Sequence, residues 1–97
     1  MSNFDLNTSR FIINPRYRLQ WEAAQNCHVL LYPEGLVQLS GSAAEIMQRC
    51  QQATTLDAIT KDLQQQFPEA DELADDVREF LLEAQAQHWI VAADATN

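Results

Sequence analysis

Residues 27–49 read CHVLLYPEGLVQLSGSAAEIMQR, and they predict two strands, the turn between them and the start of a helix. Residues 27–32 and 36–39 are rich in apolar, β-branched and aromatic side chains, and Pro33-Glu34-Gly35 separates them as a hairpin turn. Because the second strand continues directly into a helix, we expect it at the edge of a small sheet. The N–H and C=O groups of an outer strand lack partners on one side, and an extended peptide can pair with them.

Apolar residues at helical spacing predict three helices after this hairpin. Ser42 and Glu45 have the spacing of a capping box, which places Ser42 at the N-terminus of the first helix. Thr54 or Thr55 supplies the N-cap of the second helix, and Pro68 opens the third. The apolar stripes of the three helices are Ala43, Ile46, Met47 and Cys50; Leu56, Ile59 and Leu63; and Leu73, Val77, Phe80, Leu81 and Ala84.

Residues 17–22 alternate strictly between apolar and polar side chains. This alternation predicts a half-buried strand with Tyr17, Leu19 and Trp21 on one face. Together with the hairpin, it gives an α+β fold in which a three-stranded antiparallel sheet is followed by three helices. The chain has 97 residues and 46% hydrophobic content, which suits a single domain.

The ends of the chain show no clear period, so we expect the domain to be shorter than the chain. The expected divisions are a flexible N-terminal segment at residues 1–14, the folded domain at residues 15–91 and a flexible C-terminal tail at residues 92–97. The first residues resemble no secretory signal, and no apolar run has the length needed to span a bilayer. We therefore expect a cytoplasmic protein.

The net charge of −8 is concentrated in the second half of the chain. Residues 51–97 hold ten of the 14 acidic side chains, and their only basic side chains are Lys61 and Arg78. A surface this acidic repels nucleic acid and anionic lipid and attracts basic segments. We therefore expect neither nucleic acid nor a membrane as a partner.

The sequence carries no pattern typical of a catalytic or metal site. Cys27, Cys50, His28 and His88 show no metal-ligand spacing, so we expect the cysteines to be reduced and structural, and no metal or other cofactor. A Ser/His/Asp order and a glycine-rich phosphate loop are also absent from the sequence, which has only two glycines. The expected function is therefore binding, and the protein is not expected to be an enzyme.

Taken in order, these residues resemble the pyrroloquinoline quinone biosynthesis protein D (PqqD) family. The resemblance covers about residues 15–91. It is carried by residues 15–22 (PRYRLQWE), 30–46 (LLYPEGLVQLSGSAAEI) and 76–81 (DVREFL) with Trp89, and its most specific part is Leu30-Leu31-Tyr32-Pro33-Glu34-Gly35.

Two positions depart from the family pattern. The family commonly has Asp-Gly where this chain has Gln51-Gln52, and Gly where it has His88. Glycine eases a left-handed backbone at the end of a helix, so the geometry of both turns is in question.

The resemblance implies a winged-helix-like recognition domain for a ribosomally synthesised and modified peptide (a RiPP recognition element). Such a protein is a non-catalytic peptide chaperone in pyrroloquinoline quinone (PQQ) biosynthesis. It binds the precursor peptide PqqA in the groove between the third strand and the third helix. It then presents that peptide to the radical S-adenosylmethionine enzyme PqqE.

The residues themselves indicate how this groove would bind a peptide. Alternation places Leu36 and Gln38 on one face of the strand and Val37 and Leu39 on the other, and the sequence leaves open which pair lines the groove. The expected contacts are Leu36, Val37, Gln38 and Leu39 on the strand, and Asp75, Asp76, Arg78, Glu79 and Leu82 on the helix.

Two alternatives use the same elements. A winged helix can instead bind DNA, or serve as another protein-interaction module, because strand and helix order do not fix function. A homodimer is also possible, in which the free strand edge of one copy pairs with that of another.

Overall fold

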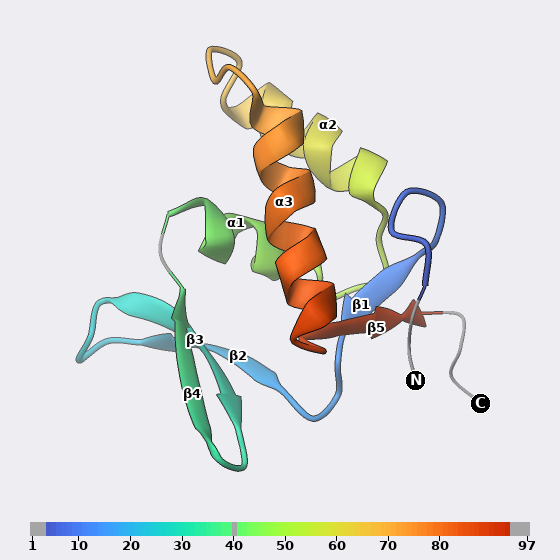
Figure 1. Ribbon diagram of the computed structural model, residues 1–97. Coiled ribbons are helices and arrows are strands. Elements are labelled where there is room, and N and C mark those ends of the chain that lie inside the picture. The colour runs from blue at the N-terminus through green and yellow to red at the C-terminus, as the bar shows by residue number, and fades with distance from the viewer. Residues whose placement is uncertain (1–3, 40, 94–97) are drawn as a thin grey trace.

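The structure, a computed structural model, describes residues 4–39 and 41–93 (Figure 1). In chain order its elements are β1 (Phe11–Ile13), β2 (Arg18–Glu22), β3 (Cys27–Tyr32), β4 (Gly35–Leu39), α1 (Ser42–Arg49), α2 (Leu56–Gln66), α3 (Leu73–Ala86) and β5 (Ile90–Ala92). Strands β2, β3 and β4 form one antiparallel sheet in that order, and β1 pairs with β5 in a second, two-stranded sheet. The predicted α+β fold, with three antiparallel strands before three helices, is confirmed.

The β3–β4 hairpin forms where the sequence predicts it, with a turn one residue shorter. Tyr32 pairs with Gly35, so only Pro33 and Glu34 form the turn and Gly35 begins β4. On the other side of β3, the antiparallel pairing of Glu22 with Cys27 completes the meander.

Helix α1 begins differently from the prediction, because Gly41 and not Ser42 is its N-cap. Gly41 has φ 53° and no side chain bonds the first turn, so the capping box of Ser42 and Glu45 does not form. A positive φ is readily adopted by glycine, which moves the start of the helix back by one residue. Glu45 instead contacts Arg49, at 3.0 Å between Oε1 and Nη1.

Helix α2 is capped as expected, whereas α3 begins later than predicted. The Thr55 hydroxyl oxygen accepts a hydrogen bond from the Ala58 N–H at 3.1 Å. Pro68 does not open α3, because the Ala70 N–H bonds the Phe67 carbonyl at 3.1 Å and closes a separate turn. The N-cap of α3 is Glu72, so part of the acidic run precedes the helix.

The core lies between the helices and the inner face of the three-stranded sheet. The predicted stripes hold at Ile46, Met47, Ile59 and Leu63, and along α3 at Val77, Leu81 and Ala84; Leu73 and Phe80 are partly buried against them. Cys50 is also buried, and burial raises the pKa of its thiol to about 12, so it remains protonated at neutral pH. Cys27 is half-buried, and neither cysteine forms a disulfide.

Strand β2 is buried over only part of its length. Leu19 and Tyr17 pack against the core, but Trp21 is 52% exposed, although the alternation placed it on the same face. Its ring contacts that of His28 edge-on, with 5.1 Å between centroids. The turn between β2 and β3 extends past the helices (Figure 1).

The folded part begins before residue 15, which corrects the expected N-terminal boundary. Leu6 and Phe11 are buried, and Phe11 pairs with Ala92 in the two-stranded sheet. The N–H and C=O of Phe11 also bond Thr54, both at 2.9 Å. Three residues are too few to show a period, so no local pattern indicates β1. Residues 1–3 and 94–97 of the expected flexible ends lie outside the described residues.

His88 occupies a left-handed position at the end of α3. Its φ is 65°, and the bonds from His88 N–H to Gln85 and from Trp89 N–H to Ala84, at 3.0 and 2.8 Å, form a Schellman motif. This is the turn at which the family commonly has glycine. Neither Gln51 nor Gln52 has a positive φ, so the other departure leaves its turn unstrained.

We expect His88→Gly to stabilise the protein by about 1 kcal/mol, because a left-handed residue with a Cβ costs about 1–2 kcal/mol. For a domain of this size, that raises Tm by about 4–8 °C in a thermal unfolding experiment. Gln87→Gly, at the neighbouring residue with φ −87°, is the matched control and should lower Tm. A lower Tm for His88→Gly would contradict the strain at this turn.

Candidate peptide-binding site

Strand β4 is an outer strand, and its pairing determines which backbone groups are free. Tyr32 and Gly35 flank a two-residue turn, so they are a hydrogen-bonded pair. Because such pairs alternate along an antiparallel ladder, Val37 bonds β3, whereas the N–H and C=O groups of Leu36 and Gln38 point outward. These two residues offer two donors and two acceptors to an additional strand.

The structure settles which side chains of β4 face the core. Leu39 is buried and Val37 is partly buried against the core, whereas Leu36 is 43% exposed and Gln38 is exposed. Leu36 and Gln38 therefore lie on the face of the sheet turned away from the helices. The side chains of a strand added to β4 would alternate between this outer face and the side of α3.

Two surface hollows link the segments at the ends of β4 to the two ends of α3. One hollow, of about 310 Å³, joins the turn at Pro33 and Glu34 to Gln87 and His88 at the end of α3. The other, of about 430 Å³, joins Gly41, just after β4, to the start of α3. Each end of β4 is thus linked by a hollow to the opposite end of α3, and the strand and the helix run in opposite directions (Figure 1).

The same contacts identify the side of α3 that faces β4. Asp76 lines one hollow and Gln87 the other, and they are about three helical turns apart, so they lie on one side of the helix. Phe80 and Glu83 fall between them on that side. Phe80 is partly buried and contacts Trp89, with 6.2 Å between ring centroids. We call Asp76, Phe80, Glu83 and Gln87 the strand-facing side of α3.

The N-terminal segment covers a different side of α3. Arg78 donates a hydrogen bond to the Asn7 side chain, and the Gln85 amide donates to the Phe4 carbonyl at 2.6 Å. In Figure 1 this segment and β4 lie on opposite sides of the helix.

The helix residues expected at the site thus lie on three different sides of α3. Asp76 is on the strand-facing side, and Arg78 is turned toward Asn7. The exposed residues Asp75, Glu79 and Leu82 recur at helical spacing on the outward surface of α3, opposite its buried stripe. Phe80, Glu83 and Gln87 were not predicted, although their spacing from Asp76 is a signal that the sequence contains.

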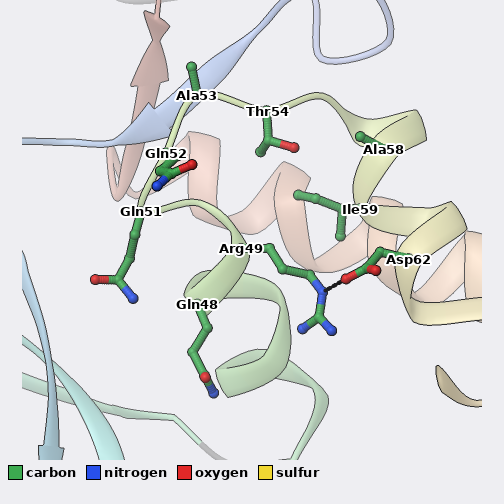
Figure 2. Close-up of a pocket in the computed structure, with 9 residues that line it drawn as sticks. All are labelled: Gln48, Arg49, Gln51, Gln52, Ala53, Thr54, Ala58, Ile59 and Asp62. Carbon is green, nitrogen blue, oxygen red and sulfur yellow. Dashed lines mark hydrogen bonds and ion pairs between the residues drawn. The ribbon is translucent and has the colours of Figure 1, made fainter.

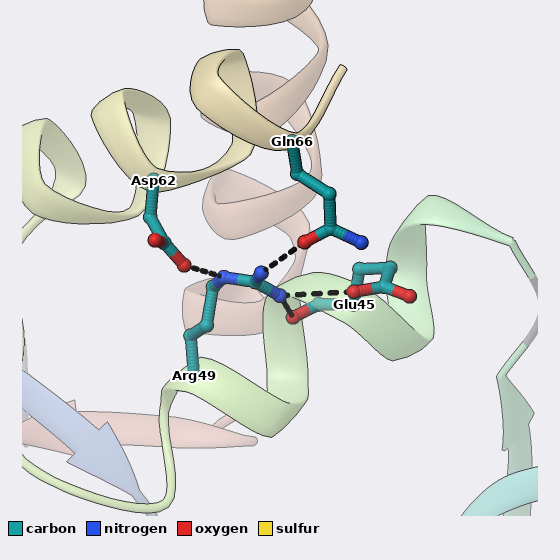
Figure 3. Close-up of polar contacts among 4 residues, drawn as sticks. All are labelled: Glu45, Arg49, Asp62 and Gln66. Atoms are coloured by element: carbon teal, nitrogen blue, oxygen red, sulfur yellow. Dashed lines mark hydrogen bonds and ion pairs between the residues drawn. The ribbon is translucent and has the colours of Figure 1, made fainter.

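A third hollow, of about 560 Å³, lies between the end of α1 and the start of α2 (Figure 2). Its two charged side chains, Arg49 and Asp62, are already paired with each other. Arg49 bonds Asp62 at 2.5 Å and Gln66 at 2.7 Å, in addition to Glu45 (Figure 3). Burial opposes the charge of Arg49, but its bonds to Asp62 and Glu45 outweigh that cost and raise its pKa. Arg49 therefore ties α1 to α2.

The described residues contain neither a candidate metal site nor a candidate membrane-spanning helix. Within residues 4–39 and 41–93, no three His, Cys, Asp or Glu side chains are grouped to hold a metal ion. No helix in this part of the chain is long and apolar enough to cross a membrane.

Comparison with known proteins identifies the family. The family model described as "Coenzyme PQQ synthesis protein D (PqqD)" matches residues 27–90, which is more than half of the chain. This chain belongs to the PqqD family. The match begins with β3 and ends at β5, so it includes both β4 and α3.

PqqD relatives are similar over most of their length. The "PqqA binding protein" of Azotobacter vinelandii is 50% identical over 74 residues, covering 76% of this chain and 80% of the relative. The protein of that name from Acinetobacter baylyi is 43% identical over 86 residues, covering 89% and 87%.

A solved structure shows the same fold. It is the solution structure of the PqqD truncation of Methylobacterium extorquens PqqCD, described as a functional and stand-alone RiPP recognition element. It superposes with a TM-score of 0.71 and covers 92% of this chain and 95% of its own, at 20% identity.

Proposed function

We propose that this protein is a non-catalytic chaperone that binds the precursor peptide PqqA in PQQ biosynthesis. The observation that carries the proposal is the free edge of β4 beside the strand-facing side of α3. The name that the relatives bear, "PqqA binding protein", supplies the identity of the peptide. The resemblance to the family further supports presentation of bound PqqA to the radical enzyme PqqE.

Backbone pairing supplies most of the proposed affinity. PqqA adds a strand to β4 and bonds the outward N–H and C=O groups of Leu36 and Gln38, at about 0.5–1.5 kcal/mol for each bond. Its side chains on one face contact Leu36 and Gln38. Those on the other face meet Phe80, which lies between the acids Asp76 and Glu83.

The acids of α3 contribute mainly to docking. Exposed ion pairs supply only about 0.2–1 kcal/mol each, so Asp76 and Glu83 orient a basic peptide more than they retain it. Main-chain pairing plus one or two apolar contacts gives a dissociation constant of about 1 µM, or about −8 kcal/mol.

Isothermal titration of the purified protein with synthetic PqqA tests this function. We expect saturable binding of one peptide per chain near that dissociation constant, and weaker binding of a scrambled peptide of the same composition, which keeps the main-chain bonds but loses the side-chain contacts. Failure to bind PqqA, or tight and salt-sensitive binding of duplex DNA, would contradict the proposal and favour a DNA-binding winged helix.

A second copy of the chain competes for the same edge in the homodimer alternative. Sedimentation with and without PqqA distinguishes the two occupants of β4. If β4 pairs with β4 of a second copy, PqqA will dissociate the dimer. If the edge is free, the protein will be a monomer before the peptide is added.

A further inference from the structure

The hollow at the start of α3 has the features of a binding pocket for a side chain. It measures about 430 Å³, and its apolar lining comes from Leu63, Phe67, Ala70 and Leu73. Phe67 is 43% exposed, so a large aromatic surface faces solvent at its mouth. We call this site the α3 hollow. Its lining is mainly apolar, in contrast to the hollow around Arg49, whose lining is mainly polar.

The α3 hollow continues the edge of β4. Gly41, two residues after the last residue of β4, lines it, and so does Asp76, the first residue of the strand-facing side of α3. A strand advances about 3.3 Å per residue, so two or three residues beyond those paired with β4 bring a peptide to this point. A peptide bound along β4 and extended by this length can therefore place a side chain at the α3 hollow.

The acidic residues near the α3 hollow indicate which charge a bound peptide would carry there. Residues 69–76 contain Glu69, Asp71, Glu72, Asp75 and Asp76, and no Lys or Arg occurs between residues 62 and 77. Glu45, also at the rim, is already paired with Arg49. Asp76 lines the hollow and the other acids of this run are close to it in the sequence, so the charge around the hollow is negative and favours a cation on the peptide beside the apolar residue.

We propose that the α3 hollow is an anchor site for one apolar side chain of the peptide bound along β4, with a Lys or Arg of that peptide adjacent to it. This inference rests on the proposed function, because the same peptide occupies both places. The edge of β4 accepts many extended sequences, since it bonds only main-chain atoms. The α3 hollow would add selection by side chain.

Phe67→Ala tests the anchor site, with Trp21→Ala as the matched control. Both side chains are large and about half exposed, but Trp21 lies on β2, away from β4 and the hollow. We expect Phe67→Ala to weaken PqqA binding about tenfold and Trp21→Ala to change it less than twofold, by isothermal titration. Thermal unfolding of each variant verifies that it folds.

A second variant keeps the test valid if Phe67→Ala unfolds. Ala70→Arg places a long cation in the α3 hollow at an exposed position, where it blocks the apolar residue and repels the neighbouring cation. We expect it to weaken binding more than tenfold. An alanine scan of the apolar residues of PqqA should find one position whose substitution lowers the affinity for the wild-type protein about tenfold. The same substitution should lower the affinity for the Phe67→Ala variant less than twofold.

The outcomes separate this inference from the proposed function. If the wild type does not bind PqqA, the proposed function fails. If the wild type binds and the folded Phe67→Ala and Ala70→Arg variants bind equally well, the function stands and the anchor site is refuted.

Discussion

Replacing Gln38 with proline is expected to weaken PqqA binding up to about tenfold, the value of one main-chain hydrogen bond, and to leave the fold intact. The pairing of β4 directs the Gln38 N–H outward, so proline removes a donor that the peptide uses and none that β3 uses. Proline is tolerated on an outer strand when the lost N–H faces solvent. Isothermal titration measures the affinity, and the far-ultraviolet circular dichroism verifies the fold.

Three variants control for other effects of Gln38→Pro. Gln38→Ala keeps the N–H and should lose less affinity for PqqA. Trp21→Pro removes an outward N–H from the opposite edge of the sheet, on β2, and should keep the wild-type affinity. Val37→Pro removes a bond to β3 and should unfold the sheet. Wild-type affinity in a folded Gln38→Pro variant would exclude strand pairing at β4.

Phe11→Ala is expected to lower the free energy of unfolding by about 3–5 kcal/mol, the usual cost of truncating a fully buried phenylalanine. The Phe11 side chain is buried in the core, its ring stacks on Phe4 at 5.8 Å between centroids, and its backbone bonds Thr54. Because domains of this size have about 5–15 kcal/mol in total, the loss is a large part of the stability. Urea denaturation measures it.

Phe67→Ala is the matched control for Phe11→Ala, because the same side chain is removed from a site that is 43% exposed. We expect Phe67→Ala to lower the free energy of unfolding much less than Phe11→Ala does. A loss below about 1 kcal/mol for Phe11→Ala would show that the N-terminal strand is not part of the core, and would restore a domain boundary near residue 15.

The sequence predicted the elements with a strong local pattern and missed those that depend on distant partners. The hairpin and the stripe of α2 are local, because turn residues and helical spacing define them. Strand β1 has three residues and exists because β5 and Thr54 complete its hydrogen bonds. Ser42 and Glu45 had the spacing of a capping box, but the positive φ of Gly41 set the start of α1.

The candidate site was predictable for the strand and less so for the helix. The outer position of β4 followed from the order of the elements, and the side that it buries is now known from Val37 and Leu39. The rotation of α3 about its axis depends on what packs on each side. The contacts of Arg78 with Asn7 and of Gln85 with Phe4 join residues far apart in the sequence, so no local pattern could reveal them.

The most direct test of strand addition at β4 is an isotope-filtered nuclear Overhauser experiment on labelled protein with unlabelled PqqA. Strand addition at β4 should give contacts between peptide backbone protons and the amides of Leu36 and Gln38, and slower exchange of these two amides in the complex. Contacts confined to the edge of β2 or to the β1–β5 pair, with unchanged exchange at Leu36 and Gln38, would contradict it.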